Sequence, residues 1–265
     1  MVSLLTLVER DGPLLVNFPH SGTEVPASIE ASFTAAGRAL PDTDWLLPEL
    51  YDFLADWPVT TLTANYSRYV IDLNRSSSGD ALYPGASETE LCPTTTFDHQ
   101  AIYRRGLAPS MQQVARRVET YWQPFHNTLM AQLSRIKARY GYALLWDAHS
   151  IASRVPRFFT GRLADLNLGT DDGKSCDEQT AQRVFSSIAQ SDYSIVRDQR
   201  FKGGYITRHY GCPKSNVHAL QMEISQRAYL HVSDRTGYHS GPARRLQKTL
   251  ELALGTLLDS AFKPA

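Results

Sequence analysis

Two short, almost wholly apolar runs of this chain each lead into a histidine that is followed by a serine. One run covers residues 14–18 and leads to His20, and the other covers residues 143–146 and leads to His149. Runs of this length without polar alternation are typical of strands that are buried on both faces, as in a parallel sheet covered by helices. Because ligands gather at the carboxyl ends of such strands, the two histidines are expected to meet at one edge of the sheet.

Further apolar runs alternate with segments of helical periodicity along the chain. Strands are also predicted at 60–64, 69–73, 194–196 and 219–224, and helices are expected at 45–54, 111–136 and 246–258. Pro124 should kink the longest of these helices, which also carries His126 as a packed residue. This alternation predicts an α/β fold, a three-layer sandwich whose mixed, mostly parallel central sheet is flanked by helices.

Length and composition favour one domain spanning 1–265, without a nucleic-acid or membrane partner. Lys plus Arg and Asp plus Glu number 27 each, so no net charge attracts nucleic acid or an anionic membrane. The apolar runs all fall short of the ~20 residues that cross a bilayer, and the N-terminus lacks the features of a signal peptide. Three widely spaced cysteines without a CxxC motif favour a reduced, cytoplasmic protein.

Three irregular stretches, rich in glycine, serine or aromatic residues, interrupt the pattern of strands and helices. They cover residues 76–97, 160–177 and 201–211. Loops of this length in a compact domain are usually functional or disordered. We expect all three to lie on the rim of one sheet and to contribute to the walls of a pocket.

The two strand-end histidines predict a metal site that needs a third ligand. A catalytic zinc takes three protein ligands from His, Asp or Glu and leaves one position for water, and other divalent ions accept the same ligands. Two carboxylates are candidates: Glu24 lies in the turn after His20, and Asp44 lies just before a predicted helix. An aspartate there is also a good N-cap, and Asp42 could take either role instead.

Two further carboxylates lie beside predicted strand ends. Glu223 belongs to the apolar run 219–224, where a carboxylate is costly unless it is paired or near a metal. Such a group fits a general base or acid, and a salt bridge to a residue such as Arg208 is the structural alternative. Asp147 precedes His149 by two residues and would either orient a ligand from behind or satisfy a strand-end amide.

Cations for binding an acidic substrate lie in two segments. Arg75, with Asn74 beside it, offers a bidentate fork to a carboxylate, whereas an ion pair with Asp72 is the structural alternative. Lys202 and Arg208 in the third irregular stretch are further candidates, although loop cations are most often only solvated. A substrate with two carboxylates would use more than one of these cations. From the residues alone, the predicted substrate is a small acidic acyl-amide.

Taken together, these segments resemble the N-formylglutamate amidohydrolase family, which is related to zinc carboxypeptidases and aspartoacylases. The matching stretches follow one another from about residue 14 to about residue 230, and as a set they are far more specific than any one of them. They lie at 19–22, 42–45, 67–75, 82–85, 146–150, 165–170, 201–211 and 218–223.

The resemblance implies a zinc-carboxypeptidase-like (phosphorylase/hydrolase-like) fold and zinc-dependent hydrolysis of N-formyl-L-glutamate to L-glutamate and formate. In bacteria this reaction can close a route of histidine degradation. The related enzymes use a His, a Glu three residues later, a second His, an Asn-Arg pair and a distant Glu. The residues that follow this scheme in order here are His20, Asn74, Arg75, His149 and Glu223.

The chain departs from the scheme at the second metal ligand. Position 23 is Thr23 rather than a glutamate, so the spacing of the related enzymes fails. Asp44 lies in a segment shared with the formylglutamate family and becomes the favoured third ligand beside His20 and His149, with Glu24 as the alternative.

The mechanism implied is attack by a metal-activated water, with Glu223 as the general base and acid. Arg75 would either stabilise the oxyanion or bind a substrate carboxylate. Two other functions remain open: a zinc amidohydrolase for another N-acyl amino acid or small peptide, and a non-catalytic protein that binds an acidic ligand. A serine hydrolase is less favoured, because neither Ser21 nor Ser150 lies in a GxSxG motif.

Overall fold

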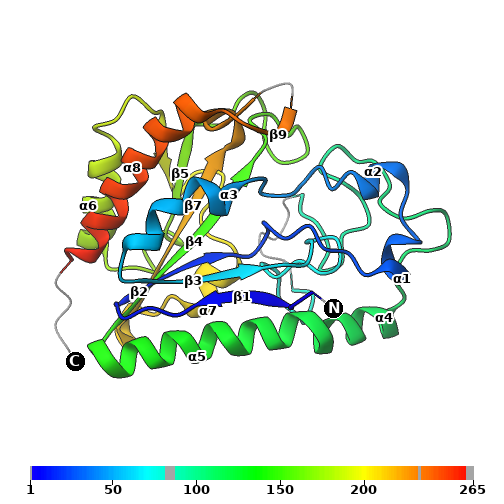
Figure 1. Cartoon of the computed structure of the whole chain (residues 1–265), viewed down its shortest axis with the longest axis horizontal. Helices are drawn as coiled ribbons and strands as arrows, with labels where there is room; N and C mark the ends of the chain where they lie inside the picture. The colour runs from blue at the N-terminus through cyan, green and yellow to red at the C-terminus, as the bar shows by residue number, and fades with distance from the viewer. Residues whose placement is uncertain (1, 81–86, 232–233, 261–265) are drawn as a thin grey trace.

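A mixed sheet runs through the centre of the molecule, with helices on both of its faces (Figure 1). The structure is a computed structural model that describes residues 2–80, 87–231 and 234–260. Within these ranges the central sheet has seven strands in the order β1-β3-β2-β4-β7-β5-β6, and β8 and β9 pair in a second, small sheet. The strands are β1 (Leu5–Val8), β2 (Leu14–Phe18), β3 (Val59–Ala64), β4 (Ala143–Ile151), β5 (Leu166–Gly169), β6 (Ile195–Arg197), β7 (Val217–Ser225), β8 (Leu230–His231) and β9 (Asp234–Tyr238).

The predicted α/β architecture with a mixed, mostly parallel sheet is confirmed. Strands β3, β2, β4 and β7 run parallel to one another at the centre, and β5 and β6 are parallel to each other. The antiparallel pairs in the described part of the sheet are β1 with β3 and β5 with β7. The carboxyl ends of the central strands therefore lie at one edge.

Helices form the two outer layers. The α-helices are α1 (Ala27–Glu30), α2 (Ala35–Arg38), α3 (Leu47–Leu50), α4 (Met111–Arg117), α5 (Gln123–Tyr140), α6 (Glu178–Ile188), α7 (Tyr205–Tyr210) and α8 (Ser240–Leu258). Helices α3, α6 and α8 cover one face of the sheet, and α5 and α7 cover the other (Figure 1). None of the helices in the described ranges is both long and apolar enough to span a membrane.

Each face of the sheet carries its own hydrophobic core, which explains the unbroken apolar runs. Along β4, Leu144 and Trp146 pack toward α3, α6 and α8, whereas Leu145 packs toward α5. All nine residues of β4 are buried for this reason. Strands with both faces covered have no exposed position where a polar residue would be favoured.

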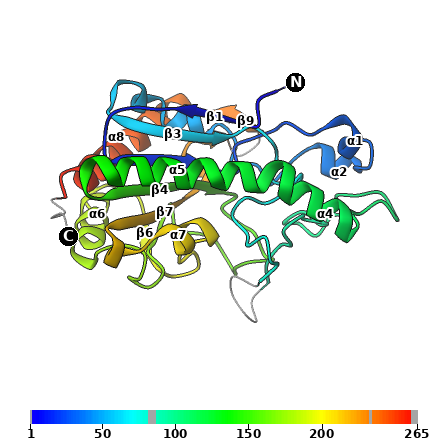
Figure 2. The ribbon, with the colours of Figure 1, turned by 90° about the horizontal axis from the view of Figure 1, so that it is seen from below.

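The long helix departs from regular geometry where Pro124 lies. Helices α4 and α5 continue as one element through a π-helical turn, Val118–Trp122 (Figure 2). Pro124 has no N–H to donate to the carbonyl of Thr120, so the α-helical ladder cannot continue unchanged at this point. The expected kink thus takes the form of a π turn directly before the proline.

Several expected elements differ in the structure. The run 69–73 is buried but forms turns rather than a strand, because its carbonyls are bonded by side chains and loops instead of a ladder. The helix expected at 45–54 is divided into α3 and a 3₁₀ turn, Asp52–Asp56, after Leu46 adopts a left-handed φ of 53°. The stretches 160–177 and 201–211 contain β5 and α7, respectively. Of the stretch 76–97, residues 81–86 lie outside the described ranges.

Candidate metal centre

The two predicted histidines meet at the carboxyl edge of the parallel strands. His20 follows β2 by two residues, and His149 lies near the end of β4, which is longer than its apolar run suggested. Their ring centroids are 4.9 Å apart. Glu223 of β7 is the direct register partner of His149, so the two side chains project from the same face of neighbouring strands.

Asp44 completes a buried group with these histidines. His20, Asp44 and His149 each offer one ligand atom within 4.8 Å of the others, and all three side chains are buried. The backbone N–H of Asp44 donates to the carbonyl of His20 over 3.1 Å, which holds the loop before α3 against the end of β2. The N-cap residue of α3 is Leu46, and no side chain caps this helix, so Asp44 does not serve as an N-cap.

The alternative third ligands lie elsewhere. Asp42 accepts hydrogen bonds from the Tyr69 hydroxyl at 2.6 Å and from the backbone N–H of Phe97 at 2.9 Å. Glu24 is exposed, and its backbone N–H donates to the carbonyl of Asn65. Of the three carboxylates that the sequence left open, the structure brings Asp44 alone to the histidines.

The donor atoms and their partners fit a divalent metal. Nε2 of His20 donates to Asp72 at 2.7 Å, and Nε2 of His149 lies 3.0 Å from Asp147. Nδ1 of His20 is buried and has no hydrogen-bond partner among the described residues, and Nδ1 of His149 lies 3.2 Å from Asp44. Histidines that bind a metal through one nitrogen commonly donate the other N–H to a carboxylate. Two imidazoles and a carboxylate are a common set of protein ligands for zinc.

The charges around the two histidines differ. Burial lowers the pKa of His20, and the nearby Arg68 lowers it further. Burial alone would lower the pKa of His149 too, but the carboxylates of Asp147 and Asp44 raise it well above its ordinary value. The negative potential that favours a proton on His149 would equally favour a metal cation beside it.

Asp72 forms its ion pair with Arg68 rather than with Arg75. Its Oδ2 accepts from Arg68 at 2.6 Å, and its Oδ1 accepts from His20 and from the backbone N–H of Asn74. Burial alone would raise the pKa of Asp72, but Arg68 and His20 hold it well below its usual range. Asp72 is therefore a buried carboxylate anion that orients one of the histidines.

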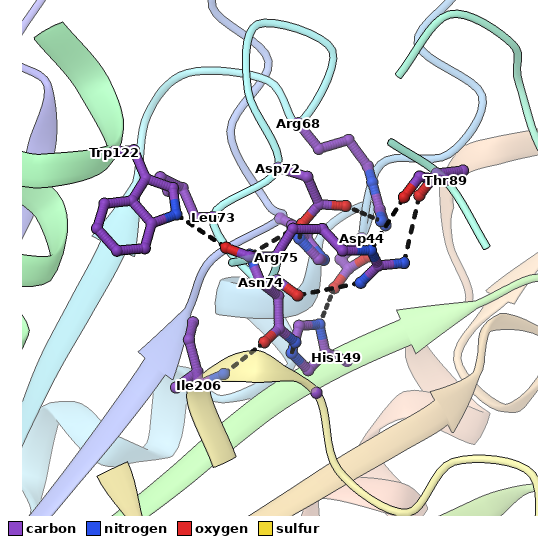
Figure 3. A network of polar contacts seen from close by, with 12 residues as sticks. Asp44, Arg68, Asp72, Leu73, Asn74, Arg75, Thr89, Trp122, His149 and Ile206 are labelled. Atoms are coloured by element: carbon purple, nitrogen blue, oxygen red, sulfur yellow. Dashed lines mark hydrogen bonds and ion pairs between the residues drawn. The ribbon is translucent and has the colours of Figure 1, made fainter. Parts of the chain in front are cut away.

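Asn74 and Arg75 follow Asp72 in one network of polar contacts (Figure 3), and both line a pocket together with the three candidate metal ligands. The Oδ1 of Asn74 accepts from the backbone N–H of Ile206 at 2.8 Å, and its Nδ2 lies 3.0 Å from Nε2 of His149. The Arg75 guanidinium donates to the carbonyl of Thr89 at 3.1 Å and to that of Asn74 at 3.0 Å.

Glu223 lines the same pocket and carries an unusual pKa. Its side chain is buried, and burial raises its pKa from 4.5 to about 8, although His149 opposes the shift. The salt bridge with Arg208 is not formed, because Arg208 pairs with Asp171 at 3.1 Å. A carboxyl group that titrates near neutral pH suits proton transfer.

Each of the two predicted loop cations is paired with an aspartate. Lys202 pairs with Asp172 at 3.0 Å and Arg208 pairs with Asp171, so both anchor the loop, and neither lines the pocket. Arg68 and Arg200 also line it, although the sequence pattern indicated neither as part of the site. The signal for Arg200 was present, since it is an arginine directly before the aromatic start of the cationic stretch 201–211.

Comparisons with known proteins agree on one family. The family model of N-formylglutamate amidohydrolase matches residues 12–230. N-formylglutamate deformylases of Pseudomonas aeruginosa and Pseudomonas putida are 46% and 44% identical to the chain over 247 residues, which cover 93% of this chain and 92% of each relative.

Solved structures resemble the chain over nearly its whole length. The crystal structure of N-formylglutamate amidohydrolase from Ralstonia eutropha JMP134 has a TM-score of 0.81 at 25% identity and covers 97% of this chain and 96% of that one. A gene product of Agrobacterium tumefaciens shares the fold, with a TM-score of 0.71 at 14% identity and the same coverage.

The raised pKa of Glu223 predicts a pH-dependent cost to the metal-free fold. The folded state retains the proton between pH 4.5 and about 8 while the unfolded state loses it, so stability falls as pH rises through this window. With a chelator present, the free energy of unfolding of Glu223→Gln should therefore exceed that of wild type by up to about 3 kcal/mol at pH 7. Urea unfolding at several pH values measures the difference, which should shrink toward pH 4.5. Glu24→Gln is the exposed control, and a difference independent of pH would contradict the prediction.

Proposed function

The chain belongs to the N-formylglutamate amidohydrolase family, and we propose that it hydrolyses N-formyl-L-glutamate to L-glutamate and formate with a divalent metal ion, expected to be zinc. The observation that carries the proposal is the buried group of His20, Asp44 and His149, which shares one pocket with Glu223 and lies within the residues that match the family. The proposal extends to the role that the resemblance implied, a closing step of histidine degradation in the cytoplasm.

The metal would be held by one nitrogen of each histidine and by the carboxylate of Asp44. The unpartnered Nδ1 of His20 is the strongest support for this assignment, because a buried polar atom without a partner is costly. When bound, such an ion lowers the pKa of a water molecule and polarises a carbonyl oxygen. Asp72 and Asp147 keep the rings oriented through Nε2.

Glu223 would carry the proton during the reaction. As the water oxygen forms its bond to the formyl carbon, the Glu223 carboxylate takes a proton from that water. When the carbon–nitrogen bond breaks, Glu223 gives the proton to the amine nitrogen of the leaving glutamate. Its register pairing with His149 across β4 and β7 supports this role, and its pKa of about 8 makes both protonation states accessible near neutral pH.

Arginines would bind the two carboxylates of the substrate. Arg75 and Arg200 both line the pocket, and we assign substrate binding to them, whereas Arg68 forms its ion pair with Asp72. Arginine is suited to this task because its planar fork can bind a carboxylate through two hydrogen bonds. Lys202 and Arg208 would support the site indirectly by anchoring the loop that carries Arg200.

Formate release from N-formyl-L-glutamate, with metal content measured on the same sample, tests the proposed function. Activity should track about one metal ion per chain, disappear on chelation and return when zinc is added. N-formyl-L-aspartate and N-acetyl-L-glutamate should be poorer substrates. If the protein binds metal but releases no formate, the proposed metal centre is retained and N-formyl-L-glutamate is excluded as the substrate. If it neither binds metal nor releases formate, the proposal is overturned.

The third ligand is tested by removing one carboxylate at a time. Asp44→Asn should lower zinc affinity at least about 100-fold, because even residues that only support metal ligands contribute 10- to 100-fold. Glu24→Gln is the matched control and should retain its metal. Both affinities can be measured by competition with a chromogenic chelator, and the reverse pattern would make Glu24 the ligand.

The role of Glu223 predicts a loss of turnover without loss of metal. Glu223→Gln should lower kcat by about 10²- to 10⁴-fold, the usual contribution of a general acid–base group, while its metal content stays at the wild-type level. Steady-state kinetics and metal analysis on one preparation separate the two effects. Turnover within a few-fold of wild type would remove Glu223 from proton transfer.

A further inference from the structure

One long helix holds the segment that carries Asn74 and Arg75. Three side chains of this helix donate to main-chain carbonyls of residues 70–75, each over 2.9 Å. The pairs are Arg117 with the carbonyl of Val70, Trp122 with that of Arg75, and His126 with that of Leu73. The carbonyls on either side of Asn74 are therefore both bonded to α5 or to the turn before it, and Figure 3 shows the contact made by Trp122.

The π-helical turn is what brings these donors to one side of the helix. Arg117 and Trp122 are five residues apart: Arg117 directly precedes the turn Val118–Trp122, and Trp122 is its last residue. In an α-helix, side chains five apart are rotated by about 140° from each other, because 3.6 residues complete a turn. A π turn bonds residue i to residue i+5, so residues five apart come to nearly the same face. Trp122 and His126 are four apart and share a face in the regular helix that follows.

The contact at His126 connects this helix to α7. Its Nε2 donates to the Leu73 carbonyl, and its Nδ1 therefore accepts from the Tyr210 hydroxyl at 2.9 Å. Burial lowers the pKa of His126 to about 4, so the ring is neutral at pH 7 and keeps this arrangement. Its ring centroid lies 3.9 Å from that of Trp122.

Helix α7, which His126 contacts through Tyr210, also holds the side chain of Asn74. The backbone N–H of Ile206, near the start of α7, donates to Oδ1 of Asn74. The segment is therefore fixed from two helices, by its carbonyls on one side and by the Asn74 side chain on the other. Gly204 lies so close that a Cβ there would be 2.2 Å from Nδ2 of Asn74, which leaves this side chain little freedom.

We propose that Trp122 is a positioning residue, which holds the Arg75 main chain so that the guanidinium faces the substrate carboxylate. The proposal rests on the proposed function, because it takes Arg75 as a substrate-binding residue. Trp122 itself does not line the pocket. It acts through the single N–H that it donates to the Arg75 carbonyl, at the point where the helix changes register.

The test is Trp122→Phe, which keeps an aromatic ring and removes the N–H. KM for N-formyl-L-glutamate should rise about three- to tenfold, the range that one lost hydrogen bond gives, with kcat changed less than about twofold. Metal content and Tm should stay close to wild type. Tyr121→Phe is the matched control, because it also removes one polar group from the same turn. The Tyr121 ring packs against Tyr66, so this substitution should leave KM unchanged.

A double-mutant cycle with Arg75→Ala distinguishes positioning from general support of the fold. If Trp122 acts through Arg75, Trp122→Phe should change KM by less than about twofold in the Arg75→Ala background. Equal effects in both backgrounds would overturn the proposal, as would an unchanged KM in the single variant. If Trp122→Phe does not fold, His126→Leu, which removes the neighbouring bond to Leu73, enters the same cycle.

Calorimetry of L-glutamate binding to the same four proteins repeats the double-mutant cycle without turnover. Trp122→Phe should raise Kd in the wild-type background and change it little in the Arg75→Ala background. A wild-type protein that binds glutamate but releases no formate would overturn the proposed function alone. Additive effects in an active enzyme would overturn the positioning role alone.

Discussion

The buried carboxylate of Asp72 is the interaction on which the site depends. It accepts from His20, from Arg68 and from the backbone of Asn74, so one side chain joins the end of β2 to the segment with the Asn-Arg pair. A buried carboxylate is stable only when its oxygens are paired, and removing one partner leaves an uncompensated charge. The hydrogen bond from His20 to Asp72 also keeps the ring proton of His20 on Nε2, so Nδ1 retains a lone pair that could bind a metal.

The sequence predicted the parts of the site that strands deliver. An apolar run with both faces buried implies a parallel strand, and His20, His149 and Glu223 follow from where such strands end. The choice between Asp44 and Glu24 could not be made from the residues alone, because the backbone bond between Asp44 and His20 joins a loop to a strand end. The family resemblance supplied that choice, and the structure places Asp44 beside both histidines.

The parts that sequence could not predict depend on loops and on contacts distant along the chain. The run 69–73 is as apolar as a strand, but its carbonyls are bonded by the long helix, and nothing local distinguishes these two uses of an apolar run. Arg200 and Lys202 belong to one loop, in which Asp198 and Gly203 adopt positive φ, so neighbouring side chains turn in different directions. Composition marked that loop as functional without indicating which cation reaches the pocket.

The pairing of β2 with β4, which brings the end of β2 beside His149, makes the candidate metal group an indicator of correct strand alignment. A slip of one residue between these two strands would turn the side chain of His149 to the opposite face of the sheet and separate it from His20. Since His20 and Asp44 come from segments far from β4 in the chain, an ion held by all three residues would recognise only the correctly aligned molecule. Metal binding would then shift the population toward that alignment by mass action, in proportion to the affinity of the centre.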